Sequence, residues 1–219
     1  MNLVNLLQET PLGNTVGSLS STQHAVLVGS LLGDGTLRRQ GKRINALLEV
    51  NHAWQNKEYV DWKYQVFQSH VLTPPRRRQG NGKRVAYRFT TRSLPVFTNY
   101  YRWFYQDRKK AIPSDLSLDP MALAVWFMDD GSKSRSACYL NTQQFSVREQ
   151  QLLRRVLWNT FGIESDLNRD KQYFRLRITT ESTRRLVDLI WPFVLPLFRY
   201  KFMTDPVTTD PKGEASISD

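Results

Sequence analysis

The carboxylates of two Asp-Gly pairs are the side chains in this sequence best suited to metal chemistry. In ALAVWFMDDG, residues 122 to 131, an apolar run ends on Asp129 and Asp130. The segment HAVLVGSLLGDG, residues 24 to 35, ends in the same way on Asp34. Carboxylates at the end of a buried segment are costly unless something pairs with them. Two carboxylates that meet there need a cation, and their oxygen atoms suit Mg²⁺.

Each Asp-Gly pair follows a segment that is predicted to be a helix. Ser20 with Gln23 fits a capping box, and Asp119 followed by Pro120 fits an N-cap with proline at the first helical position. Both segments are apolar on all sides, which predicts that they are buried at the centre of the protein. Small residues such as Gly29 would let the two backbones approach closely. We therefore expect two paired central helices, each delivering an aspartate at its C-terminal end.

The sequence also contains an internal repeat. YRFTTRS (87 to 93) and LRITTES (176 to 182) share a pattern of Arg, apolar, Thr, Thr, any residue, Ser. The strands they belong to, VAYRFTT and YFRLRIT, alternate apolar and polar residues, as strands with one exposed face do. Aromatic, helix-like stretches follow, 94 to 106 and 183 to 195. The prediction is an α+β fold of two pseudo-symmetric αββαββα halves.

The repeat and the composition of the ends predict how the chain is divided. The last residues, DPVTTDPKGEASISD, are polar and acidic, which is typical of a disordered segment. The expected parts are an N-terminal extension (1–19), a first half-domain (20–113), a second half-domain (114–203) and a disordered tail (204–219).

The composition describes a folded and strongly basic protein. The 219 residues include 31 Lys+Arg against 20 Asp+Glu, a formal net charge of +11, and 40% are hydrophobic. No run of apolar residues is long enough for a membrane span, and no secretory signal is recognisable, so we expect an intracellular protein without a membrane partner. A single cysteine, Cys138, and three histidines exclude an internal disulfide and a Cys/His zinc cluster. The charge indicates a polyanionic partner.

The basic residues are clustered, and they fall on or beside the predicted strands. Seven of them and no acidic residue lie between Arg76 and Arg92, whereas solvated charged faces usually mix the two signs. The pattern favours a nucleic acid as the partner. The candidate residues for binding it are Arg38, Arg39, Lys42, Arg43, Arg76, Arg77, Arg78, Lys83, Arg84, Arg88, Lys133, Arg135, Arg169, Lys171, Arg175 and Arg177.

Two segments resemble the signature helices of a known enzyme family. LVGSLLGDG (27 to 35) and LAVWFMDDG (123 to 131) are similar to the motifs of the LAGLIDADG homing endonucleases in their single-chain, two-motif form. VLTPP, KKAIP and LNTQ occur in the order found in the branch that includes the yeast mitochondrial omega-intron endonuclease. The resemblance covers roughly residues 24 to 202. It implies a saddle of two antiparallel sheets over the major groove of double-stranded DNA.

The resemblance also implies roles for particular residues. Asp34 and Asp130 would bind divalent metal and the scissile phosphates, with one cut in each strand. Lysines near each site, which would stabilise the pentavalent phosphate, match Lys110 and Lys201. The metal site would further include the two residues that precede the aspartates, Gly33 and Asp129, with Asp129 in a supporting role.

Three functions fit these residues. The favoured one is a monomeric, Mg²⁺-dependent, site-specific double-strand DNA endonuclease, in which Mn²⁺ can substitute for Mg²⁺. The alternatives on the same fold are an intron maturase that binds RNA and a DNA-binding regulator without catalysis. Retention of both Asp34 and Asp130 argues for cleavage, because a pure binding protein gains nothing from paired buried carboxylates. A mitochondrion, a chloroplast or a bacterial cytoplasm would each fit.

Overall fold

The computed structural model describes residues 18–202 except 40, 42, 43, 81, 83 and 135. The predicted tail and nearly all of the predicted N-terminal extension lie outside the described residues. The same is true of four candidate DNA-binding residues, namely Lys42, Arg43, Lys83 and Arg135.

The two halves have the same order of main elements, as the repeat predicted. The first half contains α1 (Ser21–Leu32), β1 (Thr36–Arg38), β2 (Leu47–Ala53), α2 (Lys57–Phe67), β3 (Arg76–Gln79), β4 (Val85–Thr90) and α3 (Pro95–Phe104). The second half contains α4 (Pro120–Asp130), β7 (Gly131–Ser134), β8 (Ala137–Leu140), α5 (Val147–Phe161), β9 (Ser165–Asp170), β10 (Tyr173–Ile178) and α6 (Thr180–Ile190). Each half is thus helix, two strands, helix, two strands, helix, which confirms the predicted α+β fold.

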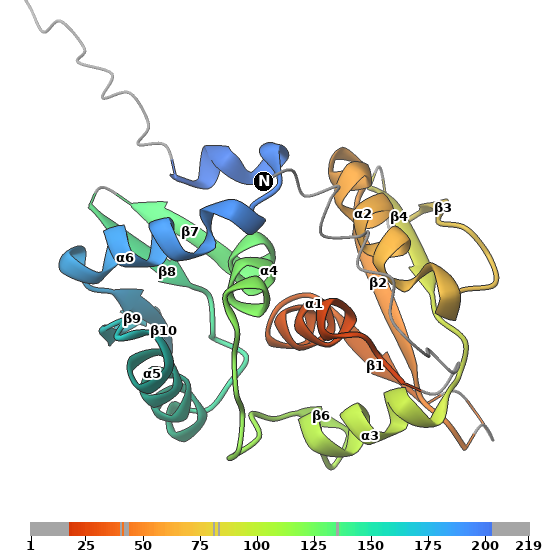
Figure 1. Cartoon of the computed structure of the whole chain (residues 1–219), viewed down its shortest axis with the longest axis horizontal. Helices are drawn as coiled ribbons and strands as arrows, with labels where there is room; N and C mark the ends of the chain where they lie inside the picture. Colours follow the sequence, from red (N-terminus) through yellow and green to blue (C-terminus); the bar gives the residue numbers. More distant parts are fainter. Residues whose placement is uncertain are drawn as a thin grey trace, which may run out of the picture.

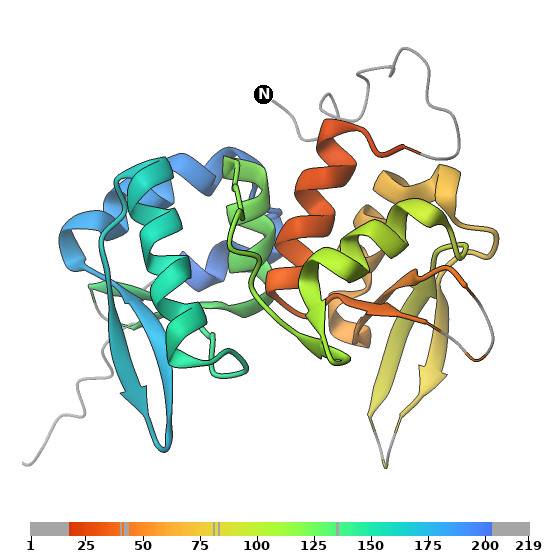
Figure 2. The ribbon, with the colours of Figure 1, turned by 90° about the horizontal axis from the view of Figure 1, so that it is seen from below.

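Each half folds its four strands into one antiparallel sheet. The strand orders are β1-β2-β4-β3 and β7-β8-β10-β9, so both sheets have the same topology. Helices cover one face of each sheet, with α2 and α3 on the first and α5 and α6 on the second. Figure 2 shows the β3–β4 and β9–β10 hairpins at opposite ends of the molecule, extending to the same side.

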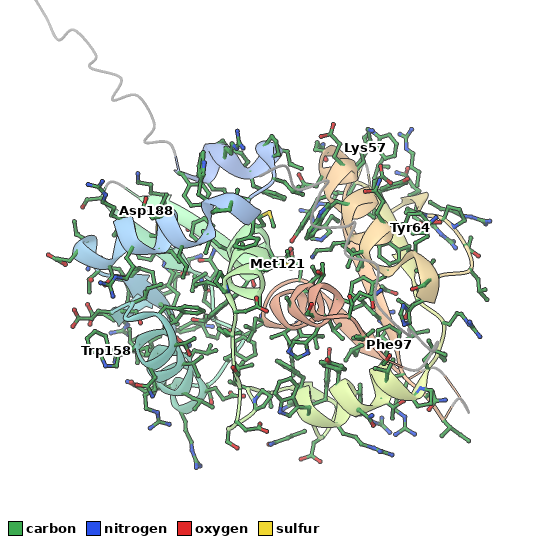
Figure 3. The ribbon with its side chains drawn as sticks, in the orientation of Figure 1. Lys57, Tyr64, Phe97, Met121, Trp158 and Asp188 are labelled. Atoms are coloured by element: carbon green, nitrogen blue, oxygen red, sulfur yellow. The ribbon has the colours of Figure 1, made fainter. Side chains whose placement is uncertain are left out.

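The helices α1 and α4 pack against each other at the centre, between the two sheets (Figure 1). Both have the predicted N-caps: the Ser20 side chain accepts a hydrogen bond from the backbone of Gln23, and that of Asp119 from the backbone of Ala122. A Cβ atom added to Gly29 would lie 2.4 Å from the carbonyl oxygen of Ala122, so glycine is required for this close approach. Figure 3 shows the side chain of Met121 between the two halves.

The hydrophobic core is continuous across the two halves, because both central helices belong to it. In α4 every side chain from Met121 to Met128 is at most 8% exposed. Away from the centre, Trp158 lies on the outer side of α5 and is 60% exposed (Figure 3). No helix in the described part of the chain has both the length and the apolar character that crossing a lipid bilayer requires.

Candidate active site

The ends of the two central helices open onto a shared cleft of about 480 Å³. Asp34 follows α1, and Asp130 is the last residue of α4. Both aspartates line this cleft, as the sequence predicted for the helix junction. The lining residues are Gly33, Asp34, Thr36, Tyr105, Lys110, Asp130, Asn141, Gln143 and Gln144.

Both aspartates of the cleft hold their protons more tightly than an ordinary carboxyl. Burial and, after it, the negative charges of Asp34 and Asp129 raise the pKa of Asp130 to about 7. The pKa of Asp34 is also raised, first by burial and then by Asp129. A bound cation would relieve this repulsion, and carboxylate oxygens are the ligands that hard divalent cations prefer. The donor set of the cleft therefore fits such an ion.

Lys110 is brought to the end of α1 by a small hairpin that the sequence did not predict. Residues 105 and 106 were expected to continue the helix, but β5 (Tyr105–Gln106) pairs with β6 (Lys109–Lys110) instead. The reversal is a two-residue turn at Asp107 and Arg108, whose φ angles are +48° and +66°. The Nζ atom of Lys110 then donates hydrogen bonds to the carbonyl oxygens of Gly33 and Gly35, at 2.8 and 2.9 Å.

Lys201 makes the corresponding hydrogen bonds to backbone carbonyls at the end of α4. It belongs to the 3₁₀ segment η5 (Pro196–Phe202), and its Nζ atom donates to the carbonyl oxygen of Met128 at 2.7 Å. A cation at a helix C-terminus is stabilised by the unpaired carbonyls there. Burial lowers the pKa of Lys201, and it lowers that of Lys110 to about 8, against the pull of the neighbouring aspartates. The structure thus places one lysine at the C-terminal end of each central helix.

The side chain of Asp129 is fully buried and is not among those that line the cleft. Its two carboxylate oxygens lie 3.1 and 3.2 Å from the Nζ atom of Lys63, which is equally buried on α2. One of these oxygens also accepts a hydrogen bond from the backbone N–H of Asp34, at 3.3 Å. A Cβ atom on Gly33 would lie 2.4 Å from that of Asp129, so the glycine leaves room for this aspartate. The carbonyl oxygen of Gly33 is held by Lys110.

His52 of β2 lies near the carboxylates of both Asp34 and Asp129. Its ring nitrogens are 3.6 Å from Asp34 Oδ2 and 3.9 Å from Asp129 Oδ1. Burial and the nearby Lys63 lower the pKa of His52 to about 4, so the ring is neutral at neutral pH. The ligand atoms of His52, Asp34 and Asp129 all lie within 4.8 Å of one another, so this group could also hold a metal ion.

The basic residues of the first sheet fall on both of its faces. The strand register places Arg88 directly opposite Arg76, and Arg78 opposite Ala86, so these three arginines share the face that the helices leave open. Arg38 and Arg88 on that face both lie near the buried Glu49, at 3.0 and 3.9 Å.

Arg77 has the opposite orientation. It pairs with Tyr87, whose hydroxyl donates to Asp61 of α2, and its guanidinium lies 5.1 Å from the centre of the Trp54 ring. It therefore lies on the helix-covered side of the sheet.

The second sheet shows the same division. Arg175 and Arg177 alternate with the buried Leu176 and Ile178, so both arginines face away from the helices. The guanidinium of Arg175 lies 4.3 Å from the centre of the Tyr139 ring.

Lys133 and Arg169 lie on the other side of this sheet, opposite Cys138 and Phe174 respectively. Lys133 donates a hydrogen bond to the carbonyl oxygen of Phe202. Lys171 sits in the β9–β10 turn, where its φ angle is +56°. Two further candidates are exposed at the ends of first-sheet strands, Arg39 and Arg84.

Several residues of the site were not singled out from the sequence. They are His52, Lys63, Tyr105, Asn141, Gln143 and Gln144. One signal for Lys63 was present in the repeat. Lys63 is the seventh residue of α2, and the seventh residue of α5 is the buried Leu153. A buried lysine at the helix position where the other half buries a leucine indicates a specific partner.

The comparisons with known proteins agree with the fold and with the two signature helices. The model of the LAGLIDADG DNA endonuclease family matches residues 24–186. This chain belongs to that family, as the two signature helices predicted. In structure it is similar to the homing endonuclease I-WcaI bound to its DNA recognition sequence, with a TM-score of 0.79 and 26% identity over 94% of this chain and 99% of that one.

Two curated relatives carry different functional names. A probable intron-encoded endonuclease 1 from Wickerhamomyces canadensis is 28% identical over 200 residues, which cover 85% of this chain and 86% of the relative. A cytochrome b mRNA maturase bI2 from Saccharomyces cerevisiae is 26% identical over 222 residues. That match covers 90% of this chain but 51% of the maturase, so the chain spans about half of that relative.

Proposed function

We propose that the protein is a site-specific, double-strand DNA endonuclease that works as a monomer and uses Mg²⁺, with Mn²⁺ as a substitute. The observation that carries this proposal is that Asp34 and Asp130 line one cleft. The cleft lies between two sheets whose open faces carry arginines. Family membership and the DNA-bound structural relative support it. An intracellular setting, in an organelle or a bacterium, stays a prediction from the sequence.

The residues of the cleft have separate tasks in this proposal. Asp34 and Asp130 would hold the metal, which, when bound, supplies an activated water and stabilises the leaving 3′ oxygen. Lys110 and Lys201 place positive charge beside the phosphates and offset the charge that develops on them. The arginines on the open sheet faces hold the backbone and base edges of the duplex in register.

Cleavage of a randomised DNA library tests this function. The purified protein is incubated with the library in Mg²⁺, and the cut ends are sequenced. We expect ends that share one long asymmetric sequence, and none in a parallel reaction with EDTA. Full cleavage in EDTA would contradict the metal-dependent mechanism, and the absence of any cut ends would contradict the endonuclease.

The affinity for DNA should depend steeply on salt. Each phosphate neutralised by Lys or Arg releases counterions, so we expect affinity to fall about 10³-fold or more between roughly 50 and 200 mM salt. Replacing Arg78 by Gln should reduce the salt slope by about 1. Arg77→Gln is the matched control, since Arg77 lies on the other face of the same strand. Filter binding at several salt concentrations measures this, and a flat response would remove DNA as the main partner.

Cation binding without DNA should weaken in acid. The pKa of Asp130 is raised to about 7, so the carboxyl is protonated below pH 7 and the proton competes with the metal. We expect calcium affinity to fall about tenfold per pH unit below that value, as linkage to one proton requires. Isothermal titration calorimetry at pH 6, 7 and 8 measures it. Asp130→Asn should bind weakly with a flatter pH dependence, and an unchanged wild-type affinity at pH 6 would contradict the assignment.

A maturase activity is the second candidate, favoured by the similarity to the bI2 maturase. It predicts specific binding to a structured intron RNA in competition with excess unrelated RNA. Asp34→Asn should leave that binding unchanged, because RNA binding does not use the metal site. Cleavage and RNA binding can be measured on the same preparation, so the two activities can be separated.

A further inference from the structure

The strongest asymmetry of the molecule lies directly behind the candidate active site. The side chains of Lys63 and Asp129 are both fully buried and form an ion pair that joins α2 of the first half to α4 of the second. Neither residue has a charged counterpart in the repeat. Gly33 occupies the position of Asp129 before the other motif aspartate, and the seventh residue of α5, as Lys63 is of α2, is Leu153.

The contacts of this pair lead to one of the two motif aspartates. Both oxygens of Asp129 are within hydrogen-bond distance of Lys63, and one of them accepts the backbone N–H of Asp34. The Lys63 ammonium also lies 4.2 Å from the centre of the Tyr59 ring, which helps to fix its position. Asp130 lies in the same helix as Asp129, but among the described contacts none links its backbone N–H to the pair. The pair thus fixes the position of the Asp34 backbone.

We infer that Lys63 is a positioning residue for the first site: it fixes the Asp129 carboxylate as an anchor for Asp34 and thereby keeps that carboxylate from acting as a metal ligand. This inference rests on the proposed endonuclease function. The ammonium occupies the place of a cation beside the His52–Asp34–Asp129 group, so a divalent ion is directed to the open cleft that Asp34 shares with Asp130. Loss of Lys63 should slow the cleavage of one DNA strand more than that of the other, since the described residues of the second half form no such buried pair.

Strand-resolved cleavage tests this asymmetry. Lys63→Met removes the charge and keeps a side chain of similar length. With a target labelled separately on each strand, we expect one nicking rate to fall 10- to 100-fold, as loss of a supporting partner of a metal ligand typically does. The other rate should change by less than about threefold, so nicked DNA accumulates. Leu153→Met at the equivalent position is the matched control, with both rates near wild type. Equal slowing of both strands, or none, in folded Lys63→Met would overturn the inference.

A second measurement needs neither DNA nor activity. Without Lys63, Asp129 is free to bind a cation together with His52 and Asp34, so calcium should raise the melting temperature of Lys63→Met more than that of wild type. The double variant Lys63→Met/Asp129→Asn should lose the extra shift. Because it carries no unpaired buried charge, the double variant also serves for strand-resolved cleavage if Lys63→Met does not fold.

The two measurements separate the possible failures. Equal calcium shifts in wild type and Lys63→Met would overturn the positioning role whatever happens to DNA. A wild-type protein that cuts no DNA but shows the expected difference in calcium shifts would contradict the proposed endonuclease and leave the role of Lys63 supported.

Discussion

Asp34→Asn and Asp130→Asn are each expected to abolish double-strand cleavage, with a rate loss on the order of 10³-fold or more, while DNA binding stays normal or tightens. The rate falls because each variant removes a charged oxygen from the cleft that would hold the metal, and losses of this size follow removal of one group that stabilises developing charge. Binding is spared because a negative charge beside phosphate is removed. Cleavage rates and gel-shift affinities on the cognate site measure both effects.

The controls for these variants come from the same chain. Asp188→Asn on α6 changes an aspartate whose side chain is 71% exposed and should cut at the wild-type rate. Asp129→Asn should still cut at least one strand, because Asp129 faces Lys63 and not the cleft. If Asp129→Asn is inactive on both strands and Asp130→Asn cuts normally, the metal site is displaced by one residue from the position proposed.

The largest loss of stability is expected from Asp129→Asn. The change leaves the Lys63 ammonium buried without a carboxylate, and breaking a buried ion pair in this way costs about 3–5 kcal/mol of unfolding free energy. Urea denaturation in EDTA measures the loss without interference from metal. Lys63→Met in the same chain should restore part of it, because the double variant no longer buries an unpaired charge.

The reference for this measurement is again Asp188→Asn, which should change the stability by no more than about 0.5 kcal/mol. If Asp129→Asn lowers the unfolding free energy by less than about 1 kcal/mol, the Lys63–Asp129 pair contributes no more than an ordinary surface ion pair does. That result would mean that Lys63 finds other partners, or water, once the carboxylate is gone.

Local signals made the fold predictable from the sequence. The Ser20 and Asp119 caps, the all-round apolar character of the central helices and the period-two strands each depend on residues a few positions apart. The repeat then fixed the order of elements in both halves. The β5–β6 hairpin was missed because aromatic residues continue past Phe104, and the turn at Asp107 and Arg108 has no glycine to mark it.

The placement of the candidate site residues was predictable where they follow the motifs and was missed where it depends on tertiary packing. Asp34, Asp130 and the two lysines lie together because the paired helices and their flanking segments carry them there. Nothing near Lys63 indicates that it meets Asp129, which is 66 residues away. The face on which an arginine lies follows from strand register, so Arg77 could not be separated from its neighbours before the sheet was known.

The contact between Gly33 and Asp129 makes the two halves complementary and not interchangeable. A symmetric dimer of two second halves would set two Asp129 side chains against each other at the helix crossing, where a single added Cβ already lies 2.4 Å from its neighbour. A dimer of two first halves would bury two copies of Lys63 with no carboxylate between them. Chimeras that combine one half with a half from another protein must therefore carry a matching glycine, aspartate and lysine across the junction, whatever sequence their sheets recognise.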